Sequence, residues 1–194
     1  MGFVGYCEHR ALHSKWLWPL HRSHHSPQQF TLINTSRAHP FESALSSIVN
    51  ALALAAAGFS ADAIAIFGFY ALFVALFLHS HLTGFAWLER IGLCTPAGHR
   101  LHHGRAQRFH DRNFGEMTNI WDRVFGTYLA PQADVDTVEI GVDAPEGRHN
   151  TMRPFREIVL QTMDWAQLMR SEAARLLPRG ERRPGDAAAT AIHR

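Results

Sequence analysis

The longest apolar stretch of the chain covers residues 44–79, in which Asp62 is the single acidic or basic side chain apart from the terminal histidine. The sequence Gly-Phe-Ser-Ala-Asp at 58–62 divides this stretch into two pieces of about 15 to 18 residues. As an α-helix each piece would be about 23 to 27 Å long, slightly less than the ~30 Å hydrocarbon core of a bilayer. The pattern predicts a helical hairpin that crosses a membrane twice. A buried hairpin in a soluble helical bundle is the alternative.

A second pattern, with helical periodicity, covers residues 153–176 and predicts an amphipathic helix on the surface of the domain or of a membrane. This helix would belong to a C-terminal extension over residues 131–177. Residues 178–194 are rich in Pro, Arg, Gly and Ala and are expected to form a disordered tail. The apolar positions of the helix are Phe155, Ile158, Val159, Met163, Trp165, Leu168 and Met169.

The charge distribution adds an orientation to the predicted hairpin. The formal net charge is only +2, and no run of basic residues alternates with aromatic residues, so nucleic acid is not an expected partner. Two crossings return the chain to the side where it started, and positive-inside bias makes that side cytoplasmic. The basic residues that flank the hairpin are Arg10, Arg22 and Arg37 before it and Arg90, Arg100, Arg105 and Arg108 after it.

Three histidine motifs stand out among the 14 histidines of the chain. The first is HxxxH, and the second and third, on either side of the hairpin, are both HxxHH. Spacings of i, i+3 and i+4 place the rings of each motif roughly on one side of a helix, and Pro27 would end the helix of the second motif. The eight imidazoles of the three motifs are His9, His13, His21, His24, His25, His99, His102 and His103.

This number of imidazoles indicates a site for more than one metal ion. A tetrahedral structural zinc takes four ligands, usually with cysteine among them, whereas eight histidines suit two ions. Imidazole binds iron, zinc, copper and nickel, so the ligand type does not identify the metal. The ligands lie outside the apolar stretch, whereas a transporter is expected to place ionisable ligands inside its membrane helices. This placement favours an enzyme over a metal carrier.

The order HxxxH, HxxHH, hairpin and HxxHH resembles the fatty acid hydroxylase/sterol desaturase superfamily. The resemblance extends over residues 3–130 and includes the sequence between the motifs. The matching segments are YCEHRALHSKWLWPLHRSHHSP at 6–27, RAHP at 37–40, TPAGHRLHHGR at 95–105 and HDRNFGEMTNIWDRVFGTY at 110–128.

The resemblance implies a fold and an activity. The fold would be all-α, an integral membrane hairpin with a cytoplasmic helical cap that carries the histidine boxes in a catalytic domain over residues 1–130. The activity would be O2-dependent hydroxylation or desaturation of a fatty acyl chain, a sterol or an isoprenoid. Two iron ions would be the cofactor, with zinc as a substitute on purification. Electrons would come from a cytochrome b5-like protein, a ferredoxin or a reductase.

The resemblance also extends the list of site residues. His79 joins the eight box histidines as an expected metal ligand, because the family often carries further ligands at the end of the second apolar helix. Residues expected to support the ligands are His81, His110, Asp111, Glu116 and Asp122. A salt bridge to a nearby arginine is an equally good explanation for Asp122.

One feature departs from the family pattern. Family members usually begin with a further pair of membrane helices and an acidic residue before the first box. Here only eight residues precede His9. The expectation is therefore either a fragment or a minimal member, and the alternatives to an active enzyme are a non-catalytic metal-binding membrane protein and a truncated inactive relative.

Overall fold

The computed structural model describes residues 2–132, 134–142 and 154–176, and within these ranges the regular structure is helical, without a β-strand. The all-α class expected from the sequence is therefore confirmed for this part of the chain. Short 3-10 helices lie at Leu32–Ser36, Ala86–Ile91, Gln107–Phe109 and Val135–Thr137. The α-helices are α1 (Gly2–Leu12), α2 (Trp18–His25), α3 (Pro40–Ala56), α4 (Ala61–Leu78), α5 (Pro96–His102), α6 (Ile120–Phe125) and α7 (Pro154–Leu176).

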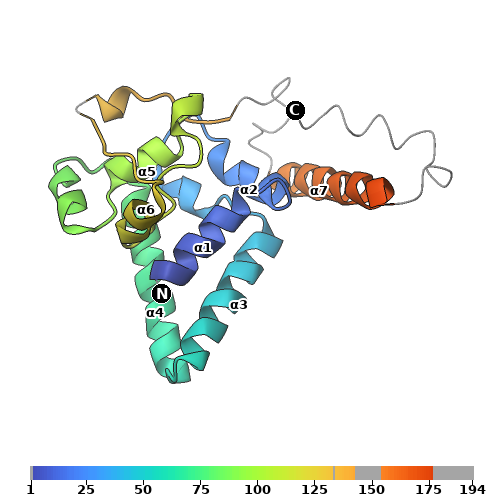
Figure 1. Cartoon of the computed structure of the whole chain (residues 1–194), viewed down its shortest axis with the longest axis horizontal. Helices are drawn as coiled ribbons and strands as arrows, with labels where there is room; N and C mark the ends of the chain where they lie inside the picture. The colour runs from blue at the N-terminus through green and yellow to red at the C-terminus, as the bar shows by residue number, and fades with distance from the viewer. Residues whose placement is uncertain (1, 133, 143–153, 177–194) are drawn as a thin grey trace.

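Helices α3 and α4 form the hairpin that the apolar pattern predicts. Gly58 adopts a φ of 85°, a left-handed conformation that glycine reaches without steric cost, and this allows the tight reversal. The Ser60 hydroxyl then accepts a hydrogen bond from the amide of Ala63 (3.3 Å) and caps α4. The two helices meet at this turn and diverge towards the rest of the molecule, with α1 next to the opening between them (Figure 1).

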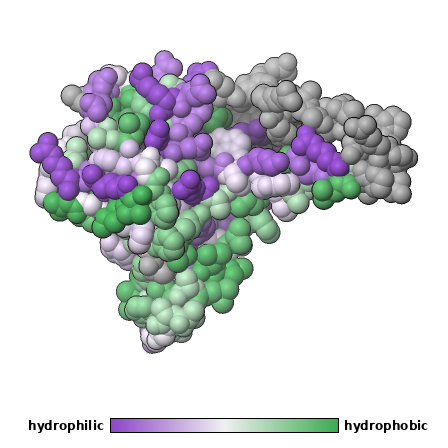
Figure 2. All heavy atoms as spheres, in the orientation of Figure 1, coloured by the Kyte–Doolittle hydropathy of each residue, from purple (hydrophilic) through white to green (hydrophobic). Residues whose placement is uncertain are grey.

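The outer surface of the hairpin is apolar. Ile66 and Phe69 on α4 are 69% and 68% exposed, and Leu52 on α3 is 64% exposed. The hairpin accordingly forms an apolar projection below a more hydrophilic body (Figure 2). Within the described residues α4 is the one helix long and apolar enough to cross a membrane, and α3 is a shorter apolar helix of 17 residues. A core helix of a soluble bundle would be mostly buried, whereas the outer face of α4 is exposed.

Helix α7 lies across α2, in the position of the predicted amphipathic helix. The Arg22 guanidinium pairs with Asp164 (2.5 Å), and the Trp165 indole N–H donates to the carbonyl of Trp16 (3.0 Å). Phe155 and Val159 on α7 remain exposed. The predicted tail at 178–194 lies outside the described residues.

Helix α5, which carries the third histidine box, is fixed by contacts at its N-terminus. The Thr95 hydroxyl accepts from the Gly98 amide (3.2 Å) and donates to the buried Glu89 carboxylate (2.6 Å). The Glu89 carboxylate lies directly against the Cα of Gly98, in the space that a β-carbon would occupy. A β-carbon at this position would therefore force the buried Glu89 carboxylate to shift and would disturb its hydrogen bond with Thr95.

We predict that Gly98→Ala destabilises the protein by about 1–3 kcal/mol, because the added methyl group overlaps the buried Glu89 carboxylate. The melting temperature of the metal-free protein in detergent should fall accordingly. Gly68→Ala on α4 is the matched control, since no atom lies within 4 Å of the place its methyl group would take and alanine favours the helix. Equal melting temperatures for the two variants would contradict the proposed packing.

Candidate metal centre

The structure brings the nine histidines expected as ligands into two adjacent groups. Within each group, one nitrogen from each ring lies within 4.8 Å of the corresponding nitrogens of the others. The groups adjoin, and the rings of His25 and His103, one from each, stack with centroids 4.3 Å apart. The first group contains His9, His13, His21, His25 and His102, and the second contains His24, His79, His99 and His103.

Each HxxHH box is divided between the two groups. On an α-helix, positions i and i+4 differ by about 40° around the axis, whereas i+3 and i+4 differ by about 100°. The i and i+4 rings of a box therefore share one group and the i+3 ring reaches the other. His24 leaves the first group in this way, and His102 leaves the second. The sequence predicts that the three rings lie roughly on one side of the helix, and it leaves open which group each ring joins.

Ring nitrogens converge in both groups without a protein group between them. The Nε2 atoms of His21 and His25 lie 3.1 Å apart, and those of His79 and His99 also lie 3.1 Å apart. Other buried ring nitrogens have no hydrogen-bond partner, among them Nε2 of His9, His13 and His102. Burying a nitrogen without a hydrogen-bond partner is costly. A metal ion at the centre of each group, here called its focus, would bind the nitrogens that converge there. The donor set therefore fits two metal ions.

The opposite nitrogens of several rings are held by hydrogen bonds that point away from the foci. Such bonds select the tautomer and orientation in which the inner nitrogen is free to bind a metal. Three of the acceptors are backbone carbonyls, and the fourth is a carboxylate. The bonds run from Nδ1 of His9 to Phe114 (2.9 Å), of His79 to Ala75 (2.8 Å), of His102 to Arg112 (2.7 Å) and of His21 to Glu42 Oε1 (2.7 Å).

Asp122 supports the first group through the backbone. Its side chain is fully buried and accepts hydrogen bonds from the amides of Phe114 (2.8 Å) and Gly115 (2.7 Å) and from the Thr127 hydroxyl (2.7 Å). The Phe114 carbonyl in turn accepts from His9. Asp122 therefore positions the loop at Phe114, and the loop orients the His9 ring. Asp122 itself makes no hydrogen bond to a histidine ring of either group.

The surroundings keep the imidazoles neutral in the metal-free protein. Burial, followed by the neighbouring imidazoles, lowers the pKa of seven of these rings well below the usual 6.5. Neutral imidazole is the form that binds a metal. The seven rings are those of His9, His21, His24, His25, His99, His102 and His103.

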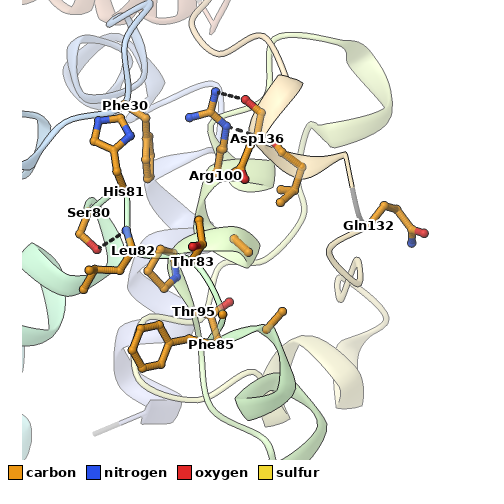
Figure 3. A pocket seen from close by; sticks show the side chains of 15 residues that line it. Phe30, Ser80, His81, Leu82, Thr83, Phe85, Thr95, Arg100, Gln132 and Asp136 are labelled. Atoms are coloured by element: carbon orange, nitrogen blue, oxygen red, sulfur yellow. Dashed lines mark hydrogen bonds between the residues drawn. The ribbon is translucent and has the colours of Figure 1, made fainter.

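The other residues expected near the ligands occupy different positions. The Asp111 carboxylate is largely exposed and lies 3.6 Å from Nδ1 of His13. His110 is exposed, and its Nε2 donates to the carbonyl of Arg105 (3.0 Å). His81 is exposed outside both groups and lines a separate cavity of about 200 Å³ beside Phe30 (Figure 3).

Glu116 lies at a cavity of about 160 Å³ that touches both histidine groups. It also lines a larger neighbouring cavity between α1, α3 and α4. The surrounding protein and the Glu8 and Glu42 carboxylates raise the pKa of Glu116 to about 7.

Sequence reasoning missed two residues of the site. Glu42 is buried in the first turn of α3 and accepts the hydrogen bond from His21. In the sequence it is an acidic residue just before the apolar stretch at 44–79, and that position could have identified it as a candidate. Phe30 is buried and stacks on His79 with ring centroids 5.5 Å apart, between the second group and the cavity that His81 lines. A single phenylalanine in a loop carries no comparable signal.

Comparison with known proteins agrees with this arrangement. Residues 1–127 match the model of the fatty acid hydroxylase family, and the chain belongs to that family. No solved structure matches the chain.

Named relatives are lipid-modifying proteins of greater length. An ornithine lipid hydroxylase, OlsE, of Rhizobium tropici is 28% identical over 71% of this chain and 41% of its own length. The fatty acid hydroxylase vlmA of a Lecanicillium species is 32% identical over 72% of this chain and 42% of its own. The alkylglycerol monooxygenase of Caenorhabditis elegans is 28% identical over 68% of this chain and 26% of its own length. The chain thus spans about a quarter to two fifths of these relatives.

The lowered pKa values predict an acid-sensitive metal-free protein. Above pH 6.5 these imidazoles are neutral in both the folded and unfolded states. Below it the unfolded chain binds protons that the folded protein does not, so the free energy of unfolding falls as the pH falls. Chemical denaturation of chelator-treated protein between pH 7.5 and pH 5 should show uptake of several protons on unfolding. A stability independent of pH over this range would contradict the predicted neutral imidazoles.

We predict that Asp122→Ala weakens metal binding at the first group about 10- to 100-fold, because two buried amides lose their acceptor and the Phe114 carbonyl loses its position. Competition with a chromogenic chelator measures this affinity. Asp134→Ala serves as the control, because Asp134 is exposed and directly precedes the 3-10 helix at Val135–Thr137. Equal affinities in the two variants would show that the loop does not position His9.

Proposed function

We propose that the protein is a membrane-bound oxygenase that hydroxylates a lipid at a di-iron centre. The observation that carries the proposal is the division of nine histidines, eight of them buried, into two adjacent groups whose ring nitrogens converge, with unpartnered Nε2 atoms in the first group. A single structural ion would leave one of the groups without a purpose. Membership of the fatty acid hydroxylase family supports iron as the metal.

The nine histidines would hold the two ions, and a bound iron pair would supply the activation of O2 that oxidation of an unactivated C–H bond requires. In the overall reaction one C–H bond is replaced by C–OH, and the second oxygen atom leaves as water. Two electrons from a redox partner and two protons balance the equation. The chain's own residues hold the site in place, keep the ligand rings neutral and shield the second group with Phe30.

The membrane location of the enzyme is part of the proposal. The exposed apolar surface of α3 and α4 suits insertion into a bilayer, with the turn at Gly58 leading. The histidine groups lie at the other end of the hairpin, together with the flanking arginines. Positive-inside bias makes that end cytoplasmic. A cytochrome b5-like protein, a ferredoxin or a reductase would then reach the site from the cytoplasm.

Hydroxylation is favoured over desaturation because the relatives described above are named as hydroxylases and monooxygenases. A catalytic role is favoured over metal storage by the cavity of about 160 Å³ that reaches His9 and His21 of the first group and His24, His79 and His99 of the second. A storage site needs no such access. The alternative that the chain is a truncated inactive relative is tested by the same experiment that tests the activity.

We expect the iron-reconstituted protein to contain two iron ions per chain and to form a hydroxylated lipid only with O2 and a reductant. His24→Ala and His102→Ala, one ring from each group, should each remove at least one iron and abolish product. The double variant should be little worse, because residues that act as a unit are strongly non-additive. Iron analysis and mass spectrometry of the lipids measure both effects.

His149→Ala, at a histidine outside every box, is the control and should retain iron and activity. If His24→Ala and His149→Ala behave alike, the proposed metal centre is wrong. If two irons bind but no lipid is oxidised with any reductant, the protein is a metal-binding or inactive relative.

A further inference from the structure

Two cavities meet beside the metal centre. One of about 570 Å³, the hairpin cavity, lies between α1, α3 and α4, and the other is the cavity of about 160 Å³ at the histidines, the site cavity. Because the two share lining residues, they adjoin, and together they extend from the hairpin to both histidine groups. The shared residues, here called the neck, are Gly5, Glu8, Thr35, Ser46, Ala75 and Glu116.

The two ends of this space differ in polarity. Away from the neck, α3 and α4 contribute the polar Ser47 and Asn50 and the apolar Leu54, Ile64, Phe67 and Leu72. The apolar residues include Leu54 and Ile64, which lie next to the turn that joins the two helices. A polar group placed among them would lose its hydrogen bonds with water without replacement. An apolar chain can occupy this end, and a polar head cannot.

The opposite end presents hydrogen-bond acceptors. Glu8 and Glu116 lie at the neck, and Glu42 lines the site cavity just beyond it. Glu42 is 6% exposed, and its Oε2 is buried without a hydrogen-bond partner, although Oε1 accepts from His21. In the described part of the chain no lysine or arginine lines either cavity. This end therefore suits a group that donates hydrogen bonds.

We propose that the substrate lies with its apolar chain in the hairpin cavity and a hydroxyl- or ammonium-bearing head at Glu8 and Glu116. This inference rests on the proposed lipid hydroxylation. It adds that the carbon atom hydroxylated lies within a few bonds of the head, because the histidine groups adjoin the neck and not the apolar end. The C–H bond that is replaced therefore belongs to the head or to the first part of the chain.

The reverse orientation is disfavoured by the same geometry. A chain that entered with its terminal methyl group at the histidines would leave its polar head among Leu54, Ile64 and Phe67, at the depth of the proposed bilayer core. Its hydrogen-bond donors would have no acceptor there, while the buried Glu42 Oε2 would stay without a partner.

The test uses the iron-loaded chain of 194 residues and three lipids, each with one hexadecyl chain. The first has a glycerol head, the second carries the same head with both hydroxyls methylated, and the third has an ammonium-bearing head. Each is prepared with deuterium either on the carbons of the head and the chain carbons next to it or on the terminal methyl group. Loss of deuterium in the product should occur only with the label on and next to the head, and a product that keeps all its deuterium in both preparations would overturn the inference. Loss from the terminal methyl group would overturn the inference while leaving the proposed function intact.

Head recognition is tested with Glu8→Gln and Glu116→Gln, which keep the shape of the side chains and remove the charge. We expect KM for a donor-bearing lipid to rise at least about tenfold with kcat largely retained, and KM for the methylated lipid to change little. If KM rises more for the ammonium lipid than for the glycerol lipid, the head is attracted mainly by charge. If KM rises equally for both, the head is held mainly by hydrogen bonds. Glu139→Gln, outside both cavities, is the matched control. Equal KM changes for all three lipids would overturn head recognition.

The position of the chain is tested by filling the hairpin cavity. Gly68 lines it, and no atom lies within 4 Å of the place a β-carbon would take there, so the side chain of Gly68→Leu can start without a clash and add volume to the lining of the cavity. We expect this variant to prefer shorter chains, with iron content and the position of hydroxylation unchanged. Ala65→Leu, at an exposed position on α4 outside the cavity, should keep the preference of the wild type. An unchanged preference in Gly68→Leu would contradict the proposed chain site. If wild-type protein with two irons oxidises no lipid, neither these three nor any other, with any reductant, the proposed function itself fails.

Discussion

The requirement to pack nine largely buried imidazoles so that their inner nitrogens converge dominates this structure. Each ring has two nitrogens, and a buried nitrogen without a partner is costly. The fold satisfies outer nitrogens with the carbonyls of Phe114, Ala75 and Arg112 and with the Glu42 carboxylate. The inner nitrogens are left facing one another, and metal ions would complete them. Folding and metal binding are therefore expected to be strongly coupled.

The same requirement explains why residues far from the foci are buried and polar. Asp122 organises the amides of Phe114 and Gly115 and so determines where a carbonyl meets His9. Glu89 and Thr95 fix the start of α5, the helix of the third histidine box. These polar contacts lie outside the apolar hairpin, in the part of the molecule that carries the histidine boxes, here called the cap. Each is a supporting layer for a ligand that must keep its orientation.

The hairpin links the metal centre to the proposed membrane. The end of the hairpin nearest the histidines contributes His79 to the second group and Glu42, which accepts a hydrogen bond from His21 of the first group. The opposite end is the apolar turn. Because α3 and α4 diverge towards the cap, the space between them opens beside the histidines (Figure 1). The element that would anchor the protein in lipid also lines the route by which a lipid would reach the site. Substrate access and membrane insertion would thus depend on the same two helices.

The sequence by itself determined the local features. The apolar stretch and its break predict two helices joined at 58–62, and the spacing of the histidines identifies eight of the nine rings, while His79 came from the family resemblance. These features depend on the period of the helix and on turn residues, which act over a few positions. Family membership was also readable, because it rests on ordered motifs.

The tertiary structure alone decided how the rings are shared. Which ring of a box joins which group depends on how α1, α2, α5 and the end of α4 approach one another, and i, i+3, i+4 spacing leaves that open. It also decided that Asp122 acts through the Phe114 loop, that Phe30 covers His79, and that His81 and His110 lie outside both groups. The cavity and its three glutamates arise from α1, α3 and the loop at Glu116, which are distant in sequence. Contacts between distant segments depend on packing, and packing leaves no periodic trace in the chain.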